Sequence, residues 1–294
     1  MLPTGAGTAL ITPFTAAGKI DVPALTRLVT WQVEEGIDFV VACGSTGEAQ
    51  TLSPEERVLV VKTVIDAADG QIPVLAGATD NDTSRAVAEA RTMASLGVVG
   101  IMSASPYYNK PTQAGLEAHF LSIADATELP LLLYNVPGRT AIDLKPETVA
   151  ALARHPRIAG IKEASGNVRR MLDLRGLTPT DFAVLCGDDD IVVPAMAAGA
   201  VGLISVASNT MPHRISGMVA AAGRGDFGGA LAEQLRLLPF IDALFAESNP
   251  IPVKAVLEMM GMASGAVRLP LLPATAALRE RLRALMVDVG LSHG

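Results

Sequence analysis

Lys162 is the first residue whose setting suggests chemistry. It ends a largely apolar run, 158–161, and Glu163 follows it directly. Such a lysine can lay its stem on the core and hold its ammonium group in water. It can also be kept partly desolvated, so that its amine becomes neutral and attacks a carbonyl. The run by itself does not distinguish these two interpretations.

The tyrosines and one arginine stand at similar positions. Tyr107 and Tyr108 follow an apolar run, and Tyr134 with Arg139 ends another; the chain has three tyrosines in total. A buried tyrosine can be a core residue with a satisfied hydroxyl, or it can move protons when it lies beside a lysine. Arg139 is either a solvated loop residue or a planar fork for a carboxylate.

A third segment offers hydroxyl groups. Ser45 and Thr46 are flanked by Gly44 and Gly47 after the run 39–43. The simplest interpretation is an ordinary glycine turn. The alternative is a tight turn whose exposed N–H groups hold a carboxylate or an oxyanion.

One reaction type would use all of these groups. A neutral Lys162 would add to a ketone and form an imine, which on protonation draws electrons and lets a neighbouring carbon lose a proton. The hydroxyl of Tyr134 would carry protons, and the glycine-flanked turn would hold the carboxylate of a keto acid.

Metal chemistry is not expected. Asp188, Asp189 and Asp190 follow Gly187 and resemble a metal site, but we interpret them as caps of the helix that follows, because carboxylates stabilise a helix start. The histidines are scattered without ligand spacing; they are His119, His155, His213 and His293. The sequence therefore predicts neither a metal nor another cofactor.

Eight short, continuously apolar runs must position these residues. Continuous apolarity is typical of strands that are covered on both faces, as in a parallel sheet. Their starts lie about 20 to 33 residues apart, the length of one βα unit. The runs are 7–14, 39–45, 72–78, 100–106, 130–136, 158–164, 182–188 and 201–207.

The segments between the runs carry the residues that typically begin and end helices. Ser53 is a predicted N-cap, with Pro54 at the first helical position. Eight βα units predict an α/β fold, a (β/α)₈ TIM barrel in residues 1–224, with a small helical extension in residues 225–294. The alternative is an open doubly wound sheet, although no GxGxxG follows the first run.

The bulk properties fit a globular protein with ample material for a core. Of 294 residues, half are hydrophobic and 18% are charged, and the net charge is -7. An acidic chain without a basic face is not expected to bind nucleic acid, and no apolar run reaches the length that spans a membrane. No secretory signal is recognisable, so we expect a cytoplasmic protein in which Cys43 and Cys186 stay reduced.

Several motifs in one order resemble dihydrodipicolinate synthase (4-hydroxy-tetrahydrodipicolinate synthase), a family of the pyruvate-dependent class I aldolase superfamily that includes N-acetylneuraminate lyase. The likeness covers almost the whole chain. The motifs are GSTGEA (44–49), SPYYNKP (105–111), YNVPGRT (134–140), GIKEASGN (160–167), GDD (187–189), GLISV (202–206), NPIPVK (249–254) and RLPLLP (268–273).

The resemblance implies that Lys162 forms the Schiff base with pyruvate and that Tyr134 is the general acid and base beside it. Ser45 would connect Tyr134 to Tyr108, which would reach in from a neighbouring subunit. Thr46, with the backbone around it, would hold the pyruvate carboxylate.

For the second substrate, L-aspartate 4-semialdehyde, the resemblance implies that Arg139 binds the carboxylate at the mouth of the pocket. Gly187 and Ile204 would line the pocket through backbone groups. Such enzymes serve lysine (diaminopimelate) biosynthesis and are typically homotetramers, built as dimers of dimers, or tight dimers.

Other functions stay open. N-acetylneuraminate lyases share GSTGEA but generally lack an arginine at the position of Arg139, so Arg139 favours the synthase. A class II aldolase would need a histidine cluster for its metal. A non-catalytic barrel would not be expected to keep both Lys162 and Tyr134.

Feedback control is expected to differ from that of the lysine-inhibited synthases. Those carry His-x-x-His where this chain has Pro54 to Arg57, and a glutamate where it has Arg85. An arginine repels the ammonium group of L-lysine. The sequence predicts weak or absent inhibition by L-lysine.

Overall fold

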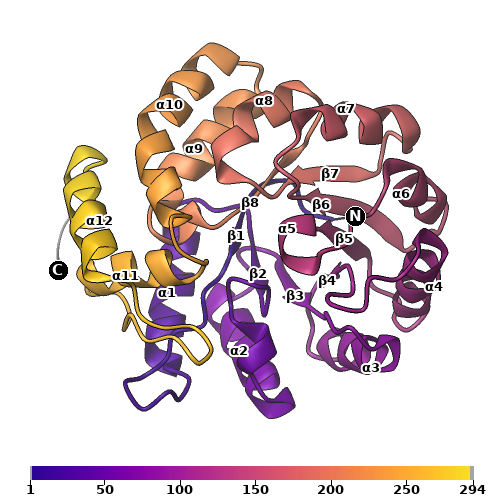
Figure 1. Cartoon of the computed structure of the whole chain (residues 1–294), viewed down its shortest axis with the longest axis horizontal. Helices are drawn as coiled ribbons and strands as arrows, with labels where there is room; N and C mark the ends of the chain where they lie inside the picture. The colour runs from indigo at the N-terminus through magenta and orange to yellow at the C-terminus, as the bar shows by residue number, and fades with distance from the viewer. Residues whose placement is uncertain (1, 292–294) are drawn as a thin grey trace.

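Eight parallel strands close into a barrel, and an outer ring of helices surrounds it (Figure 1). The computed structural model describes residues 2–291, so His293 lies outside the described residues. The strands are β1 (Gly5–Ala9), β2 (Phe39–Ala42), β3 (Val74–Gly77), β4 (Gly100–Ala104), β5 (Leu131–Asn135), β6 (Ile158–Glu163), β7 (Ala183–Cys186) and β8 (Gly202–Ser205).

Each strand pairs with the next in sequence, and β8 pairs with β1. This closure confirms the predicted TIM barrel and excludes the open doubly wound sheet. The first predicted strand, 7–14, is wrong in its bounds, since β1 ends at Ala9. Pro13 lies in the missing part of that run and has no N–H to give to a ladder.

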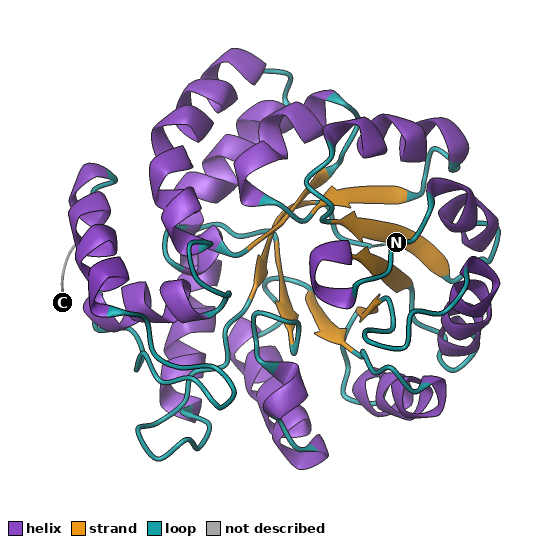
Figure 2. Ribbon diagram, viewed as in Figure 1, coloured by secondary structure: helices purple, strands orange, loops and turns teal. Residues whose placement is uncertain are grey.

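Helices occupy the connections between the strands, as the orange and purple elements of Figure 2 show. The predicted cap at Ser53 is confirmed, and it forms a capping box with Glu56. The connecting helices are α1 (Val22–Glu34), α2 (Pro54–Ala68), α3 (Thr83–Ala94), α4 (Gln113–Ala124), α5 (Pro137–Thr140), α6 (Pro146–Leu152), α7 (Val168–Leu177), α8 (Val192–Ala197) and α9 (Pro212–Gly223), with short 3₁₀ turns η1 (Ala49–Thr51), η2 (Asp189–Ile191) and η3 (Ala207–Asn209).

Three helices follow the barrel: α10 (Phe227–Leu244), α11 (Ile251–Met259) and α12 (Ala276–Asp288). Helix α10 packs on α8 and α9, and α12 packs on α10 and α11. Figure 1 shows α12 at the outer edge of the molecule. None of the helices in residues 2–291 is long and apolar enough to span a membrane.

The alternation of side chains along β5 and β6 decides what faces the barrel interior. Leu131 and Leu133 belong to the core between strands and helices, whereas Leu132 and Tyr134 belong to the inner cluster of the barrel. Because successive side chains of a strand point to opposite faces, Lys162 follows the same rule on β6 and Glu163 points outward.

Candidate active site

Lys162 and Tyr134 meet inside the barrel, near the carboxyl ends of their strands. The two residues are register partners across β5 and β6, so their side chains lie in one layer. Lys162 Nζ lies 4.5 Å from the centre of the Tyr134 ring. Lys162 is only 4% exposed, and within residues 2–291 no carboxylate forms an ion pair with it. A buried amine that lacks a counter-ion and has a phenol beside it suits attack on a carbonyl.

These residues open into a cavity of about 190 Å³. Its size admits only a small molecule. Six of the eight predicted site residues line it: Ser45, Thr46, Tyr134, Arg139, Lys162 and Gly187. The other lining residues are Ala9, Gly44, Met102, Val136, Ala164, Asp188, Val206, Phe245 and Asn249.

The glycine-flanked turn after β2 presents free donors at this cavity. The N–H of Gly47 donates to the carbonyl of Gly44 at 3.0 Å, which closes the turn. The backbone N–H groups of Ser45 and Thr46 have no protein acceptor among the described residues. Two unpaired N–H groups in succession form the kind of concavity that binds anions.

Asn249 connects this turn to the arginine at the mouth. Its side-chain Nδ2 donates to the hydroxyl of Thr46 at 2.8 Å, and its carbonyl accepts from Arg139 at 3.0 Å. Asn249 is buried, and its Oδ1 has no partner in the described part of the chain. Sequence reasoning recorded Asn249 only as part of the NPIPVK motif and gave it no role.

Gly187 lies directly against Lys162. Its N–H donates to the carbonyl of Glu163 at 2.8 Å. A Cβ at this position would come within 2.9 Å of Cε of Lys162 and 2.6 Å of Cβ of Ala164. Only glycine therefore lets the backbone after β7 approach the lysine stem this closely.

Comparisons with known proteins agree with this geometry. A model of the dihydrodipicolinate synthetase family matches residues 2–288. The chain belongs to this family. Two curated relatives, from Koribacter versatilis and Acidobacterium capsulatum, are both named 4-hydroxy-tetrahydrodipicolinate synthase. They are 47% and 48% identical over 97% and 98% of this chain, and the matches cover 96% of each relative.

A solved structure extends the likeness to three dimensions. It is the chloride-inhibited dihydrodipicolinate synthase from Acinetobacter baumannii in complex with pyruvate. The two chains are 42% identical with a TM-score of 0.97, over 98% of this chain and 99% of that one. The predicted membership of the dihydrodipicolinate synthetase family is thus confirmed.

Two residues implied by the resemblance to this family do not line the cavity. Tyr108 is 86% exposed at a backbone φ of 71°, on the loop after β4. Its predicted approach to a second copy of the chain remains a prediction. Ile204 is fully buried in the inner cluster, and Val206, two residues later, lines the cavity instead. Its contact with a ligand through backbone groups also remains a prediction.

The prediction for the three acids after β7 is right in position and wrong in the contacts. Asp188 stands at the N-cap position of η2, and Asp189 and Asp190 lie in its first turn. No side chain of Asp188–Asp190 caps η2 or α8, which directly follow. Asp189 accepts hydrogen bonds from the backbone of Val206 and Ala207 and from Ser205, so it holds the loop after β8. The N–H groups that Asp189 pairs with thus belong to the loop of another strand and not to the helix that follows it.

Neither a metal cluster nor a reactive thiol accompanies the site. Within residues 2–291 no three His, Cys, Asp or Glu side chains are grouped as metal ligands. Cys43 and Cys186 are both free and buried. Burial raises the pKa of the Cys43 thiol to about 12 and that of Cys186 higher still, so both stay protonated.

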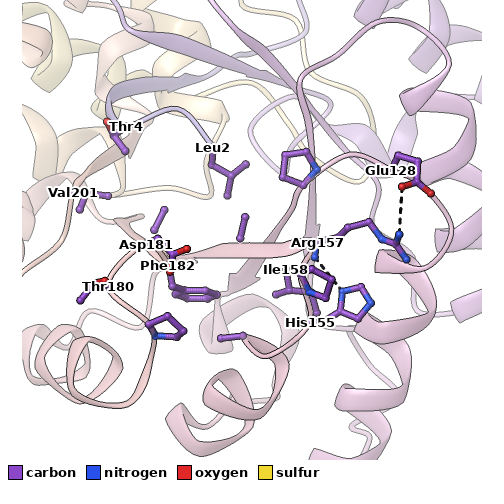
Figure 3. A pocket seen from close by; sticks show the side chains of 16 residues that line it. Leu2, Thr4, Glu128, His155, Arg157, Ile158, Thr180, Asp181, Phe182 and Val201 are labelled. Atoms are coloured by element: carbon purple, nitrogen blue, oxygen red, sulfur yellow. Dashed lines mark hydrogen bonds and ion pairs between the residues drawn. The ribbon is translucent and has the colours of Figure 1, made fainter.

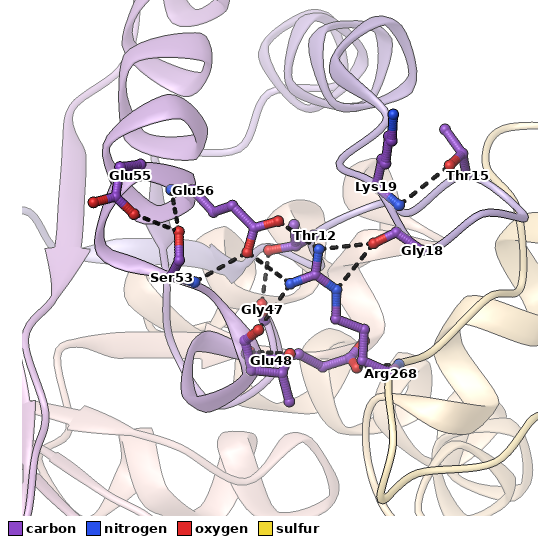
Figure 4. A network of polar contacts seen from close by, with 11 residues as sticks. Thr12, Thr15, Gly18, Lys19, Gly47, Glu48, Ser53, Glu55, Glu56 and Arg268 are labelled. Atoms are coloured by element: carbon purple, nitrogen blue, oxygen red, sulfur yellow. Dashed lines mark hydrogen bonds and ion pairs between the residues drawn. The ribbon is translucent and has the colours of Figure 1, made fainter.

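An ionic network behind the turn ties it to the last quarter of the chain (Figure 4). Glu48, in the left-handed region with φ 51°, accepts from the buried ammonium group of Lys254 and from the N–H of Arg268 at 3.0 Å. Arg268 binds both carboxylate oxygens of Glu56 at 2.6 and 2.7 Å. Spacing along the sequence gives no sign of such a network, because Glu48 and Lys254 lie 206 positions apart.

Phe14 completes this network. The centre of its ring lies 4.0 Å from Lys254 Nζ and 4.4 Å from Cζ of Arg268, so two cations contact the ring. Burial lowers the pKa of Lys254 to about 8, against the opposing effect of Glu48. The carboxylate of Glu48 thus favours the charged form of Lys254.

A larger hollow of about 760 Å³ lies at the opposite end of the barrel (Figure 3). It is lined by residues at the amino ends of β6 and β7, including Ile158 and Ala183. Arg157 in its wall donates to Asp125 at 2.8 Å and to the carbonyl of Ala124 at 2.8 Å.

Proposed function

We propose that the chain is a 4-hydroxy-tetrahydrodipicolinate synthase that condenses pyruvate with L-aspartate 4-semialdehyde. The observation that carries the proposal is the buried amine of Lys162, which forms no ion pair within residues 2–291 and lies beside Tyr134 in a small cavity with Arg139 at its mouth. The names of the curated relatives support the same activity.

Lys162 begins the reaction. Its neutral amine adds to the C2 ketone of pyruvate, water leaves, and a protonated imine forms. Loss of a proton from C3 gives an enamine. The enamine carbon attacks the aldehyde of the second substrate, and a carbon–carbon bond forms while the aldehyde oxygen takes up a proton. The amine of that substrate then attacks the imine carbon, closes the ring and releases Lys162.

The other groups bind and move protons. Tyr134 passes protons to and from the carbinolamine and the aldehyde oxygen. The unpaired N–H groups of Ser45 and Thr46, with the Thr46 hydroxyl, support binding of the pyruvate carboxylate. Arg139 binds the carboxylate of the semialdehyde. Backbone groups at Gly187 and Ile204 complete the wall of the substrate cavity.

A second copy of the chain supplies Tyr108 in this proposal. Its exposure of 86% on one chain supports that role, because this phenol, held in the left-handed region at the surface, has no hydrogen-bond partner within residues 2–291. The relay would run from Tyr134 through the Ser45 hydroxyl to Tyr108 of the second copy. We infer a homotetramer of two such pairs, or a dimer, acting in the cytoplasm.

A coupled assay tests the function. The protein is given pyruvate and L-aspartate 4-semialdehyde together with a dihydrodipicolinate reductase, and NADPH loss is followed. Turnover that requires the semialdehyde is expected. Cleavage of N-acetylneuraminate is measured in parallel, and activity there without semialdehyde turnover would assign the chain to the lyase branch instead.

A further inference from the structure

Asp188 is the one carboxylate among the residues that line the cavity, which also holds the two cations Lys162 and Arg139. Asp188 Oδ2 accepts from the N–H of Gly166 at 2.9 Å. Within residues 2–291 no lysine, arginine or histidine forms an ion pair with it. A carboxylate at a binding site that keeps an oxygen free is available to a cationic group of a ligand.

Asn249 adds a second acceptor. Its Nδ2 donates to the Thr46 hydroxyl, which turns Oδ1 away from that partner. Oδ1 has no hydrogen bond in the described part of the chain, although Asn249 is only 6% exposed and lines the cavity. A buried amide oxygen left without a donor costs free energy that a ligand N–H can recover.

The approach to Asp188 is acidic as well. Asp188 and Phe245 line both the cavity and a neighbouring hollow of about 290 Å³, whose other residues are Asp189, Asp190, Ile241 and Asp242. This arrangement attracts a cation toward the free oxygen of Asp188. Burial raises the pKa of Asp188 to about 6, which leaves it mostly ionised at neutral pH.

We propose that Asp188 and the side-chain oxygen of Asn249 bind the ammonium group of the amino-acid aldehyde, while Arg139 binds its carboxylate. This inference rests on the proposed function and adds a determinant of substrate choice. With the aldehyde carbon facing the enamine, the three contacts fix the chirality at the α-carbon. They also select against aldehyde acids that lack an amine.

The substitution Asp188→Asn tests the ammonium contact in the full-length protein. The variant keeps the acceptor for Gly166 and removes the charge. We expect the KM for L-aspartate 4-semialdehyde to rise by about 10- to 100-fold, since a hydrogen bond to a charged group is lost. Borohydride trapping of pyruvate on Lys162, followed by mass spectrometry, should proceed at the wild-type rate.

An inhibition measurement with an analogue that lacks the amine decides whether Asp188 contacts the ammonium group. Succinate semialdehyde has the aldehyde and the carboxylate but no ammonium group, so its inhibition constant should be the same in the wild type and in Asp188→Asn. Asp66→Asn, which changes an exposed acid on α2 that lines neither hollow, is the matched control and should leave all constants unchanged.

Three results would overturn the inference. Slower pyruvate trapping in Asp188→Asn would mean that Asp188 affects the reactivity of Lys162 and not the binding of the semialdehyde. An equal loss for the semialdehyde and for succinate semialdehyde would make its role structural. In the wild type alone, equal affinity for the two aldehydes would show that the ammonium group is not recognised. Pyruvate trapping without semialdehyde turnover in the wild type would instead refute the proposed function.

Discussion

The two ends of the barrel carry hollows of opposite character. The hollow at the amino ends of the strands is about 760 Å³, and that at the carboxyl ends is about 190 Å³. In the larger one Arg157 is neutralised by Asp125 and Glu128, and His155 also contacts Asp125. In the smaller one Lys162 forms no ion pair with any carboxylate of the described residues, 2–291.

The comparison shows that the larger hollow of this fold is not the candidate active site. Parallel strands send their carboxyl ends, with the loops that carry polar side chains, to one end of the barrel. There an amine, two backbone N–H groups and an amide oxygen have no hydrogen-bond or ion-pair partner in the described part of the chain. At the other end the loops satisfy Arg157 within the chain. The smaller hollow, and not the larger one, therefore holds the groups that are free to bind a ligand.

The largest effect should come from removing the amine. Lys162→Ala is expected to fold, because its position opens into a cavity, and to lower kcat/KM by at least about 10³-fold, since no imine can form. Borohydride with labelled pyruvate should give no adduct, and circular dichroism should match the wild type. Wild-type turnover by Lys162→Ala would show that the amine is not needed for catalysis, and the two ends of the barrel would then no longer differ in this respect.

Tyr134→Phe should have the next largest effect on activity. It removes one hydroxyl and keeps the ring over Lys162, so imine formation slows without loss of the cavity. We expect kcat to fall by about 10²-fold or more, as for a lost general acid and base. A KM effect with unchanged kcat would show that the hydroxyl binds substrate but moves no proton.

Lys254→Met tests the network behind the turn. Removal of one partner leaves the carboxylate of Glu48 buried and unpaired, so the free energy of unfolding should fall by about 3–5 kcal/mol. Denaturant unfolding measures this loss. The double variant Glu48→Gln with Lys254→Met should regain part of it, and a double variant as unstable as the single one would contradict the pairing.

The amino end of the barrel should respond weakly. Arg157→Gln removes exposed ion pairs and one hydrogen bond to a carbonyl, so stability should fall by about 1 kcal/mol. Its kcat/KM should stay at the wild-type value in the coupled assay. A clear kinetic loss in this variant would mean that the larger hollow takes part in function.

The smallest effect concerns L-lysine. Arg57 is held by Glu89, and the Arg85 side chain is exposed at a weak contact with Asp82. These cations disfavour an amino acid with a second ammonium group. We expect no inhibition by L-lysine up to millimolar concentrations, and half-inhibition below that range would refute the prediction.

Local patterns predicted much of this molecule. All eight strands were recognisable, because strands covered on both faces are continuously apolar. The alternation along a strand brought Lys162 and Tyr134 to one layer. Six predicted site residues therefore line one cavity.

What the sequence did not reveal depends on distant contacts. The hydrogen bond from Asn249 to Thr46 spans 203 positions, and the Glu48–Lys254 pair spans 206. The acids after β7 were misjudged for the same reason, since Asp189 serves the loop of β8. Motif order indicated that NPIPVK and RLPLLP matter, but it could not say that they hold the turn after β2.

The contacts of Asn249, Lys254 and Arg268 also affect when the pocket can form during synthesis on the ribosome. A nascent chain that has reached residue 247 already contains every strand, with Lys162 and Tyr134 in place, but nothing yet buttresses Thr46 and Glu48. Domains generally form as the chain emerges from its amino end. The barrel can thus close before the pocket is complete, and the enzyme acquires its site only when synthesis has passed Arg268.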